Sequence, residues 1–289
     1  MRELDPVSSP YGAFSLSPSE EWLRRAAMKL PGDRMRRAAE SVVRRILMSG
    51  GRDIADVEVF PGQHARVHMR DNRCEKRAFV GSKTWDSGER AAIRDAIRNI
   101  PRERELVFLD AGANAGLYTL SVLADAGKFD RPVRVVAVEP DEENRRRLNF
   151  NLQASHAEHV HVAPFALGAE EKLISLIQDD RNRGEVRIND TDEDGTIPMK
   201  PLSMVLEEAG VDHVDIMKMD IEGFEEPVLS AFFKMWPREK WPRTVLLETL
   251  HAGAAITDGA PGLCLEQGYE VAQQMRQNAV LVLPDGETT

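Results

Sequence analysis

The sequence predicts an α/β fold in which helices cover both faces of a largely parallel sheet. From residue 106 onward, strand-like apolar runs alternate with helical stretches, an alternation that is typical of parallel sheets. The first of these strands ends in a turn with glycines at 112 and 116, and a helical stretch follows the turn. The chain has 289 residues, 42% of them hydrophobic, so it can bury a substantial core.

Residues 1–75 are expected to form an extension of helices and a β-hairpin ahead of a main domain over 76–289. Residues 20–30 read as a helix, and Asp33 can cap a second helix over 34–48. One face of this second helix carries four apolar residues: Met35, Ala38, Val42 and Ile46.

A hairpin and one more helix lead from the extension to the sheet. Residues 57–60 and 65–69 read as strands joined through Pro61-Gly62-Gln63, a sequence that favours a turn. Residues 87–100 read as a helix, with Ser87 as its expected N-cap.

The main domain is expected to contain five parallel strands and a final antiparallel pair. The parallel strands are predicted over 106–109, 133–138, 159–163, 214–219 and 244–249, and the antiparallel pair over 269–273 and 279–283. Helices are predicted after the first strand and over 141–154, 202–209 and 224–235. The residues from 164 to about 200 are mostly polar, and within them 181–195 reads as a loop. Ligands of such sheets bind beyond the carboxyl ends of the strands, near the switch in strand order.

Charge and composition narrow the classes of partner. The formal charge is −10, from 48 acidic and 38 basic residues, and this disfavours a general nucleic-acid binder. Cys74 and Cys264 are too few for a disulfide framework or a zinc pattern, so a reducing, cytoplasmic setting is expected. Because no apolar run approaches about 18 residues and the N-terminus lacks an apolar signal core, no membrane partner is expected.

The turn after the first strand reads D-A-G-A-N-A-G from Asp110 to Gly116, which departs from the G-x-G-x-x-G of dinucleotide sites. A carboxylate at Asp110 would repel a phosphate about 4 Å away by roughly 4 kcal/mol at an effective dielectric of 20. The same carboxylate suits S-adenosylmethionine, which is cationic and has no phosphate. Gly112 would allow close approach to the ligand, and Asn114 could bind its carboxylate or cap the next helix. A tight turn that Asp110 merely caps is the alternative.

The second strand ends in Glu139-Pro140, 29 residues past Asp110. An acid at this point can accept hydrogen bonds from both hydroxyls of a ribose. Glu139 therefore indicates a nucleoside and Asp110 a positively charged one, although Glu139 could instead cap the helix that begins near Asp141.

Four motifs in order resemble the FkbM family of S-adenosylmethionine-dependent methyltransferases. They are D-x-G-A-N-x-G at 110–116, V-x-x-V-E-P ending at Pro140, A-L-G at 166–168, and KMDIEGFEEPVL at 218–229. The resemblance covers about residues 105–250. It implies a class I, Rossmann-like methyltransferase fold with a seven-stranded, mostly parallel sheet whose last hairpin is antiparallel. It also implies methylation of hydroxyl groups on sugars or polyketide-like products.

The adenine end of the predicted site departs from the pattern common in class I enzymes. An Asp or Asn often follows the third strand there, whereas this chain has Pro164 and Phe165. Phe165 could stack on the adenine while the backbone near Ala166 reads its edge. A Phe165 that is simply part of the core is the alternative.

Candidate catalytic residues follow the fourth and fifth strands. Alternation places Lys218 and Asp220 on one face of their strand, and Glu248 and His251 come near the same rim. Asp220 is the first candidate for a base or substrate-orienting group, and His251 is the histidine candidate because its ordinary pKa lies near neutrality. Lys218 could keep Asp220 or Glu248 ionised, or could form only a strand-end salt bridge.

A divalent ion is a further possibility at this rim. Asp220, Glu222, Glu248 and His251 could hold Mg²⁺, which would lower the pKa of a bound hydroxyl. The spacing does not require a metal, and the histidines at 156, 159 and 161 lack an acid or cysteine that would complete a set.

These observations together predict an S-adenosylmethionine-dependent O-methyltransferase that acts on a small molecule or glycan. A nucleic-acid methyltransferase, an NAD-dependent oxidoreductase with a degenerate glycine turn, and a non-catalytic cofactor-binding protein remain alternatives. The residues do not indicate which acceptor is methylated, nor the oligomeric state.

Overall fold

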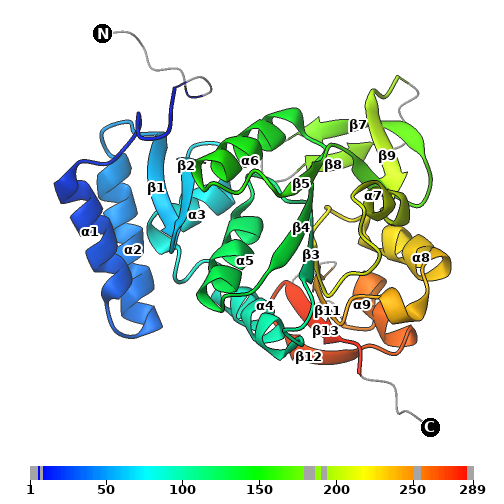
Figure 1. Ribbon diagram of the computed structural model, residues 1–289. Coiled ribbons are helices and arrows are strands. Elements are labelled where there is room, and N and C mark those ends of the chain that lie inside the picture. Colours follow the sequence, from blue (N-terminus) through cyan, green and yellow to red (C-terminus); the bar gives the residue numbers. More distant parts are fainter. Residues whose placement is uncertain (1–5, 7–8, 179–185, 190–193, 250–254, 285–289) are drawn as a thin grey trace.

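The fold is built around a seven-stranded sheet, as the sequence predicts (Figure 1). The computed structural model describes residues 6, 9–178, 186–189, 194–249 and 255–284. Across the sheet the strand order is β12-β13-β11-β10-β3-β4-β5. The strands are β3 (Leu106–Ala111), β4 (Val133–Val138), β5 (His161–Ala163), β10 (Ile216–Met219), β11 (Thr244–Glu248), β12 (Glu270–Gln274) and β13 (Asn278–Val282).

Five strands of this sheet are parallel and the last pair is antiparallel. Strand β3 pairs in parallel with both β4 and β10, and β13 pairs antiparallel with β11 and β12. The chain leaves β3 toward β4 on one side and reaches β10 on the other side only later. The strand order therefore switches between β3 and β10, which is where a ligand site is expected.

Helices cover both faces of the sheet and enclose two hydrophobic cores (Figure 1). Side chains alternate along β3, so Phe108 joins the core on one face while Val107 and Leu109 join the core on the other. The first face is covered by α4 (Ser87–Asn99), α5 (Leu117–Lys128) and α6 (Glu142–Ala154). The second face is covered by α7 (Leu202–Glu208), α8 (Glu225–Met235) and α9 (Gly259–Glu266), with the short 3-10 helix η1 (Arg238–Lys240) after α8.

The N-terminal extension contains the expected two helices and hairpin, and also one helix that the sequence pattern did not predict. Its elements are α1 (Pro18–Lys29), α2 (Asp33–Met48), β1 (Ile54–Phe60), β2 (Gln63–His68) and the unpredicted α3 (Arg73–Gly81). Ser17 and Glu20 form a capping box that fixes the start of α1. The boundary expected at residue 75 falls inside α3.

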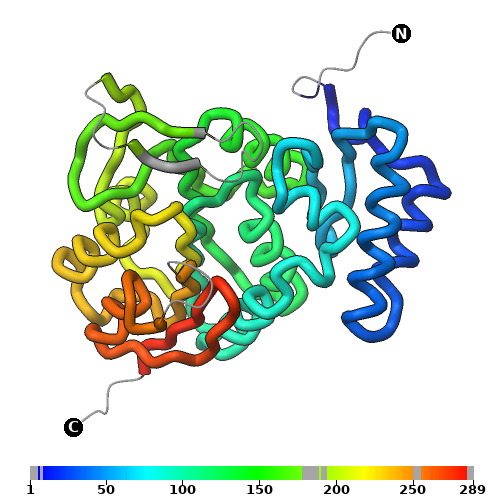
Figure 2. Tube along the Cα trace, turned by 180° about the vertical axis from the view of Figure 1, so that it is seen from behind, coloured from blue at the N-terminus to red at the C-terminus, as the bar shows by residue number. Residues whose placement is uncertain are grey.

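The extension packs against the first face of the sheet domain (Figure 2). The backbone N–H of Arg66 in β2 donates to Asn151 Oδ1 in α6 at 2.8 Å. Arg147 in α6 forms an ion pair with Asp71 at 2.7 Å. Because one core runs from β1 and β2 into α5 and α6, the two parts share a continuous apolar interior.

The apolar face of α2 that the sequence displays is exposed rather than buried. Met35, Val42 and Ile46 keep about half of their surface accessible, because α2 turns a different side inward. That inward side carries Val43 and Leu47. Asp33 is the first residue of α2 rather than its cap, since Gly32 stands at the N-cap position.

A second, four-stranded sheet occupies the region that the sequence presented as polar. Its order is β6-β9-β7-β8, with β6 (Ala166–Gly168), β7 (Lys172–Gln178), β8 (Val186–Asn189) and β9 (Ile197–Pro201). The strands are short, and the apolar residues of β7 come in adjacent pairs (173–174 and 176–177) rather than alternating with polar ones, so none of the four strands was predicted. Part of the loop expected over 181–195 is therefore strand β8, and residues 181–185 and 190–193 lie outside the described residues.

Two further details of the helices differ from the prediction. Helix α9 was not predicted, and the N-cap of α4 is Asp86 rather than Ser87.

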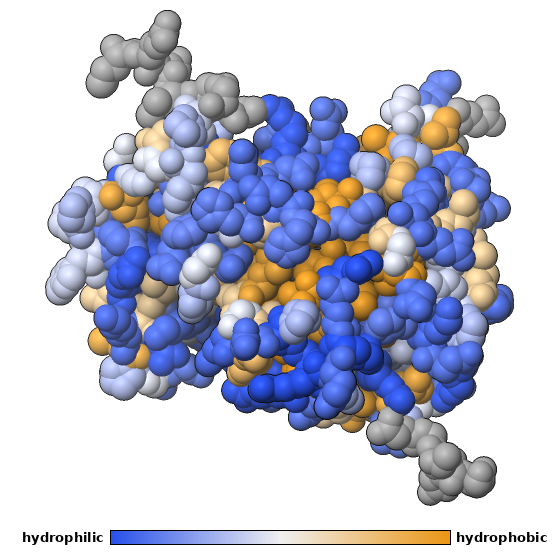
Figure 3. All heavy atoms as spheres, in the orientation of Figure 1, coloured by the Kyte–Doolittle hydropathy of each residue, from blue (hydrophilic) through white to orange (hydrophobic). Residues whose placement is uncertain are grey.

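In the described parts of the chain, no helix combines the length and the apolar character needed to cross a membrane. Polar side chains cover most of the face drawn in Figure 3, with apolar atoms gathered near its middle.

Candidate active site

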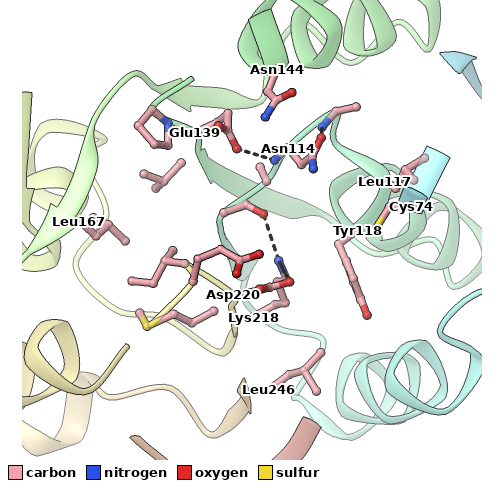
Figure 4. A pocket seen from close by; sticks show the side chains of 18 of the residues that line it. Cys74, Asn114, Leu117, Tyr118, Glu139, Asn144, Leu167, Lys218, Asp220 and Leu246 are labelled. Carbon is pink, nitrogen blue, oxygen red and sulfur yellow. Dashed lines mark hydrogen bonds and ion pairs between the residues drawn. The ribbon is translucent and has the colours of Figure 1, made fainter. Parts of the chain in front are cut away.

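A cavity lies where the carboxyl ends of β3, β4 and β10 meet, at the predicted switch point (Figure 4). Its empty volume is about 1070 Å³, including the open solvent at its mouth. We call it the strand-end cavity. Its walls come from the turn after β3, the end of β4, residues 165–167 and residues 218–222. The extension and the segment before α4 add further wall residues, among them Cys74, Glu75, Trp85 and Asp86.

The glycines of the turn are required by close packing. Gly112 has a φ of +76°, and a Cβ there would lie 1.9 Å from the backbone oxygen of Asp220. Gly116 has a φ of +84°, and a Cβ there would lie 2.4 Å from Cδ1 of Leu148 in α6. Only glycine fits both the backbone angle and the space at these two positions. Gly112 also lines the cavity, whereas Gly116 does not.

Asp110 is buried beneath the turn and does not form part of the cavity wall. Its Oδ2 accepts hydrogen bonds from the backbone N–H and the hydroxyl of Thr119, at 3.0 and 2.7 Å. Its Oδ1 lies 3.9 Å from the Lys218 ammonium. Burial raises the pKa of Asp110 while the Lys218 charge opposes that rise. Its part in cofactor binding stays a prediction, and the contacts make that part an indirect one.

Lys218 connects Asp110, the glycine turn and Asp220. Its ammonium donates to the backbone oxygen of Gly112 at 3.0 Å and lies 3.4 Å from Asp220 Oδ2. Burial alone would lower the pKa of Lys218, but Asp220 and Asp110 outweigh burial and raise it. Lys218 is therefore a buried cation between two carboxylates, and the expected pairing with Asp220 is present.

Asp220 and Glu248 lie close together beyond β10 and at the end of β11, and of the two only Asp220 lines the cavity. Asp220 lines the cavity with a side chain that is 44% exposed. Burial raises the pKa of Glu248 to about 8, helped by the negative charges of Asp220 and Glu222. These surroundings favour the protonated form of Glu248 at neutral pH. His251, the other candidate at this rim, lies outside the described residues.

Glu139 lies on the opposite side of the cavity, next to Asn114 (Figure 4). Its Oε2 accepts from the backbone N–H of Asn114 at 2.7 Å, and its Oε1 accepts from that of Asp141 at 3.0 Å. Glu139 is 4% exposed, and this burial raises its pKa to about 7. Its two oxygens have about four acceptor positions, so they can still accept hydrogen bonds from a ligand.

An apolar wall completes this side of the cavity. It contains Pro140, Phe165, Ala166 and Leu167. Phe165 is half-buried, and the Lys200 ammonium lies 3.8 Å from the centre of its ring. Ala166 is fixed by its place in strand β6, which pairs with β9. Both adenine-end candidates thus face the cavity.

Several residues in or next to the cavity wall were not found from the sequence. Asn72, the N-cap of α3, lies behind the wall and donates from Nδ2 to Oδ1 of the wall residue Asn114 at 2.8 Å. The Tyr118 hydroxyl donates to Asp86 Oδ2 at 3.2 Å, and the Trp85 ring packs against the Tyr118 ring at an interplanar angle of 58°. These residues come from three separate segments, so no local motif joins them before the chain folds.

The described residues do not form the metal site considered after the fourth and fifth parallel strands, which would have used Asp220, Glu222, Glu248 and His251. Within them, no three His, Cys, Asp or Glu side chains gather in a way that could hold an ion. Asp220 is instead paired with the Lys218 ammonium.

Comparison with known proteins identifies the family. The family described as "Methyltransferase FkbM domain" matches residues 110–270, which is more than half of the chain. No curated protein matches the sequence.

Solved structures with similar folds include several methyltransferases. The precorrin-6y C5,15-methyltransferase of Geobacter metallireducens is 13% identical, with 68% of this chain and 87% of that chain covered and a TM-score of 0.39. The METTL16 methyltransferase domain is 13% identical, with 69% and 68% covered and a TM-score of 0.43. The M. jannaschii tRNA m1G37 methyltransferase is 14% identical, with 80% and 56% covered and a TM-score of 0.41.

The family match spans the residues on which the sequence-based prediction depended. It begins at Asp110 and includes Glu139, Lys218 and Asp220. The alternative of an NAD-dependent oxidoreductase is therefore wrong. The strand order of the sheet is that of a class I methyltransferase. The chain belongs to the FkbM family of S-adenosylmethionine-dependent methyltransferases.

Proposed function

We propose that this enzyme transfers a methyl group to a hydroxyl of a small molecule or glycan. The observation that carries the proposal is the position of Asp220. Its side chain lines the cavity, is 44% exposed, lies 3.4 Å from the buried Lys218 ammonium and neighbours Glu248. Methylation of a hydroxyl requires a group that accepts its proton, and Asp220 is available for that role.

The strand-end cavity fits S-adenosylmethionine. Glu139 has free acceptor positions for ribose hydroxyls, and Phe165 and Leu167 offer apolar surface for an adenine. The Trp85 indole N–H lines the same cavity, is buried, and has no hydrogen-bond partner among the described residues, so it can donate to a ligand oxygen. When bound, the cofactor supplies a methyl group activated by its sulfonium.

In the proposed mechanism Asp220 orients the acceptor hydroxyl and takes its proton during methyl transfer. The Lys218 ammonium, 3.4 Å away, holds the Asp220 carboxylate in place, and Glu248 remains protonated because a second negative charge beside Asp220 is unfavourable. Since the Asp220 side chain is 44% exposed, the proton can pass to solvent after transfer. Tyr118 and Trp85 form an aromatic wall that excludes water from the reacting groups.

The proposal is tested by substrate screening with S-adenosylmethionine labelled with ¹³C in its methyl group. Small alcohols and glycans are screened for a gain in mass of about 15 Da, which is one ¹³CH₂. Carbon NMR then distinguishes a methoxy product from an N-methyl or C-methyl one. Products methylated only on nitrogen or carbon would refute O-methylation and leave the family assignment intact. Turnover of RNA with a steep loss on adding salt would favour the nucleic-acid alternative.

The role of Asp220 is tested with Asp220→Asn. We expect kcat to fall by about 10²–10⁴-fold, because the base is lost. Calorimetry should find the affinity for S-adenosylhomocysteine within about threefold of the wild type. Glu226→Gln, an exposed change of the same kind on α8, is the matched control and should leave both values unchanged. If Asp220→Asn kept the kcat of the wild type, Asp220 would not be the group that accepts the proton.

A further inference from the structure

A second cavity lies between the extension and the helices α4 and α5, away from the carboxyl ends of the strands. Its empty volume is about 1250 Å³, including open solvent. Helix α1 and strand β1 contribute one wall, and α4 and α5 contribute the other. We call it the basic cavity.

The charges around this cavity are strongly unbalanced. Its lining contains two acids, Glu58 and Asp125, and seven basic residues: Arg24, Arg25, Lys29, Lys83, Arg90, Arg94 and Lys128. Both acids are already neutralised, since Arg25 pairs with Glu58 at 3.2 Å and Arg94 pairs with Asp125 at 2.8 Å. This local excess of positive charge contrasts with a formal charge of −10 for the chain.

Four of the seven cations have no carboxylate partner among the described residues. Lys29, Lys83 and Lys128 are exposed and come from different elements around the cavity. Arg90 is 9% exposed and donates only to neutral groups, namely Ser121 Oγ and the backbone oxygens of Ser82 and Trp85. Burial accordingly lowers the pKa of Arg90 to about 10.

The buried Arg90 guanidinium must share the charge of nearby Asp125 with Arg94. The three exposed lysines that line the same cavity add to a focused positive field. We propose that the basic cavity binds a small anion with two or more phosphate groups. Arg90 would provide the buried, fixed charge and the three lysines would close over the ligand. The apolar surface of Met28 and Phe60 in the same cavity can contact a non-polar part of the ligand.

This site is separate from the strand-end cavity, although one wall divides the two. Phe60 lies in the basic cavity, Trp85 lies in the strand-end cavity, and their rings are 6.2 Å apart. The Arg90 guanidinium lies 4.3 Å from the centre of the Phe60 ring. Trp85 fluorescence therefore offers a second readout of binding.

The test uses pyrophosphate as the probe, in a buffer without divalent ions, with binding to the full chain measured by calorimetry. We expect saturable binding that weakens as salt rises, because salt screens the lysines. Lys83→Gln combined with Lys128→Gln should bind at least about tenfold more weakly, since two attractive charges are lost. The matched control, Lys234→Gln with Lys240→Gln on the other side of the sheet, should bind pyrophosphate as the wild type does.

Two further measurements locate and identify the ligand class. Saturating S-adenosylhomocysteine should leave pyrophosphate binding unchanged, and competition would place the anion in the strand-end cavity and refute the proposal. Citrate should bind at least about tenfold more weakly than pyrophosphate. The proposal would also be overturned if citrate bound as tightly as pyrophosphate. The same holds if the Lys83/Lys128 variant bound pyrophosphate as tightly as the wild type.

Discussion

Asp110 and Glu139 end neighbouring strands, yet their carboxylates face different surroundings. Asp110 is held by Thr119 and faces the Lys218 ammonium, below the cavity wall. Glu139 accepts from the backbone N–H groups of Asn114 and Asp141 and lies in the wall itself. The difference arises because Lys218 on β10 lies directly opposite Asp110 in the strand register.

Cofactor affinity should depend on pH through Glu139. Its pKa of about 7 lies above the ordinary 4.5 because burial disfavours the charge, so about a tenth of the ligand-free protein has it ionised at pH 6. The ionised form is the better acceptor for ribose hydroxyls. We therefore expect S-adenosylhomocysteine to bind about tenfold more tightly at pH 8 than at pH 6, as measured by calorimetry.

Glu139→Gln is the control for this pH dependence. The amide cannot ionise, so binding should be weaker and nearly independent of pH between 6 and 8. An unchanged pH dependence in Glu139→Gln would assign the titration to another group.

Gly112→Ala should destabilise the protein and impair cofactor binding. The new Cβ would meet the Asp220 carbonyl at 1.9 Å in a backbone conformation that alanine disfavours. We expect a loss of about 2–4 kcal/mol in the free energy of unfolding, measured by urea denaturation. Gly127→Ala is the matched control, because a Cβ at that position in α5 meets nothing within 4 Å. Similar stability in the two variants would contradict the packing account of the turn.

At the scale of elements, helix α3 links the extension to the glycine turn. Its N-cap, Asn72, accepts from the backbone N–H groups of Cys74 and Glu75 and donates to Asn114. One side chain thus starts a helix and holds the turn that borders the cavity.

Two substitutions separate these roles of Asn72. Asn72→Ser keeps a capping oxygen but loses the amide donor, so stability should stay within about 1 kcal/mol while the affinity for S-adenosylhomocysteine falls about tenfold. Asn72→Ala should lose both the cap and the affinity, with a further loss of about 1 kcal/mol in stability. Thermal denaturation and calorimetry measure the two effects. Wild-type affinity in both variants would show that the contact with Asn114 does not support binding.

At the scale of the whole molecule, the extension and the sheet domain share one core. Phe79 of α3 and Val57 of β1 belong to the same apolar cluster as Leu120 of α5 and Leu148 of α6. Hydrogen bonds such as Arg66 to Asn151 reinforce this contact.

The shared core predicts cooperative unfolding. Differential scanning calorimetry should find one transition, with a calorimetric enthalpy equal to the van't Hoff enthalpy. Phe79→Ala should lower the single transition temperature without splitting it, because the cavity it creates lies in the common core. Two separate transitions would show that the extension folds as its own domain.

Much of the fold and the cofactor end of the site follow from local patterns in the sequence. Alternating apolar runs specify the strands from 106 onward, and the turn at 110–116 with Glu139 indicates the cofactor. These signals are readable because each depends on residues within one strand, turn or helix. The weakly patterned strands β6–β9, helix α9 and the inward side of α2 depend on partners far along the chain, so they were missed or misread.

The sequence by itself determined the class of fold, the family and the positions of the acidic strand ends. Tertiary structure alone decided that Asp110 lies beneath the turn beside Lys218 and that Trp85 and Asp86 line the cavity. It also placed Asn72 against Asn114, and buried Arg90 in a second cavity with three lysines. Spatial neighbours set these properties, because burial and nearby charge decide what each ionisable group does and neither can be read from its local sequence.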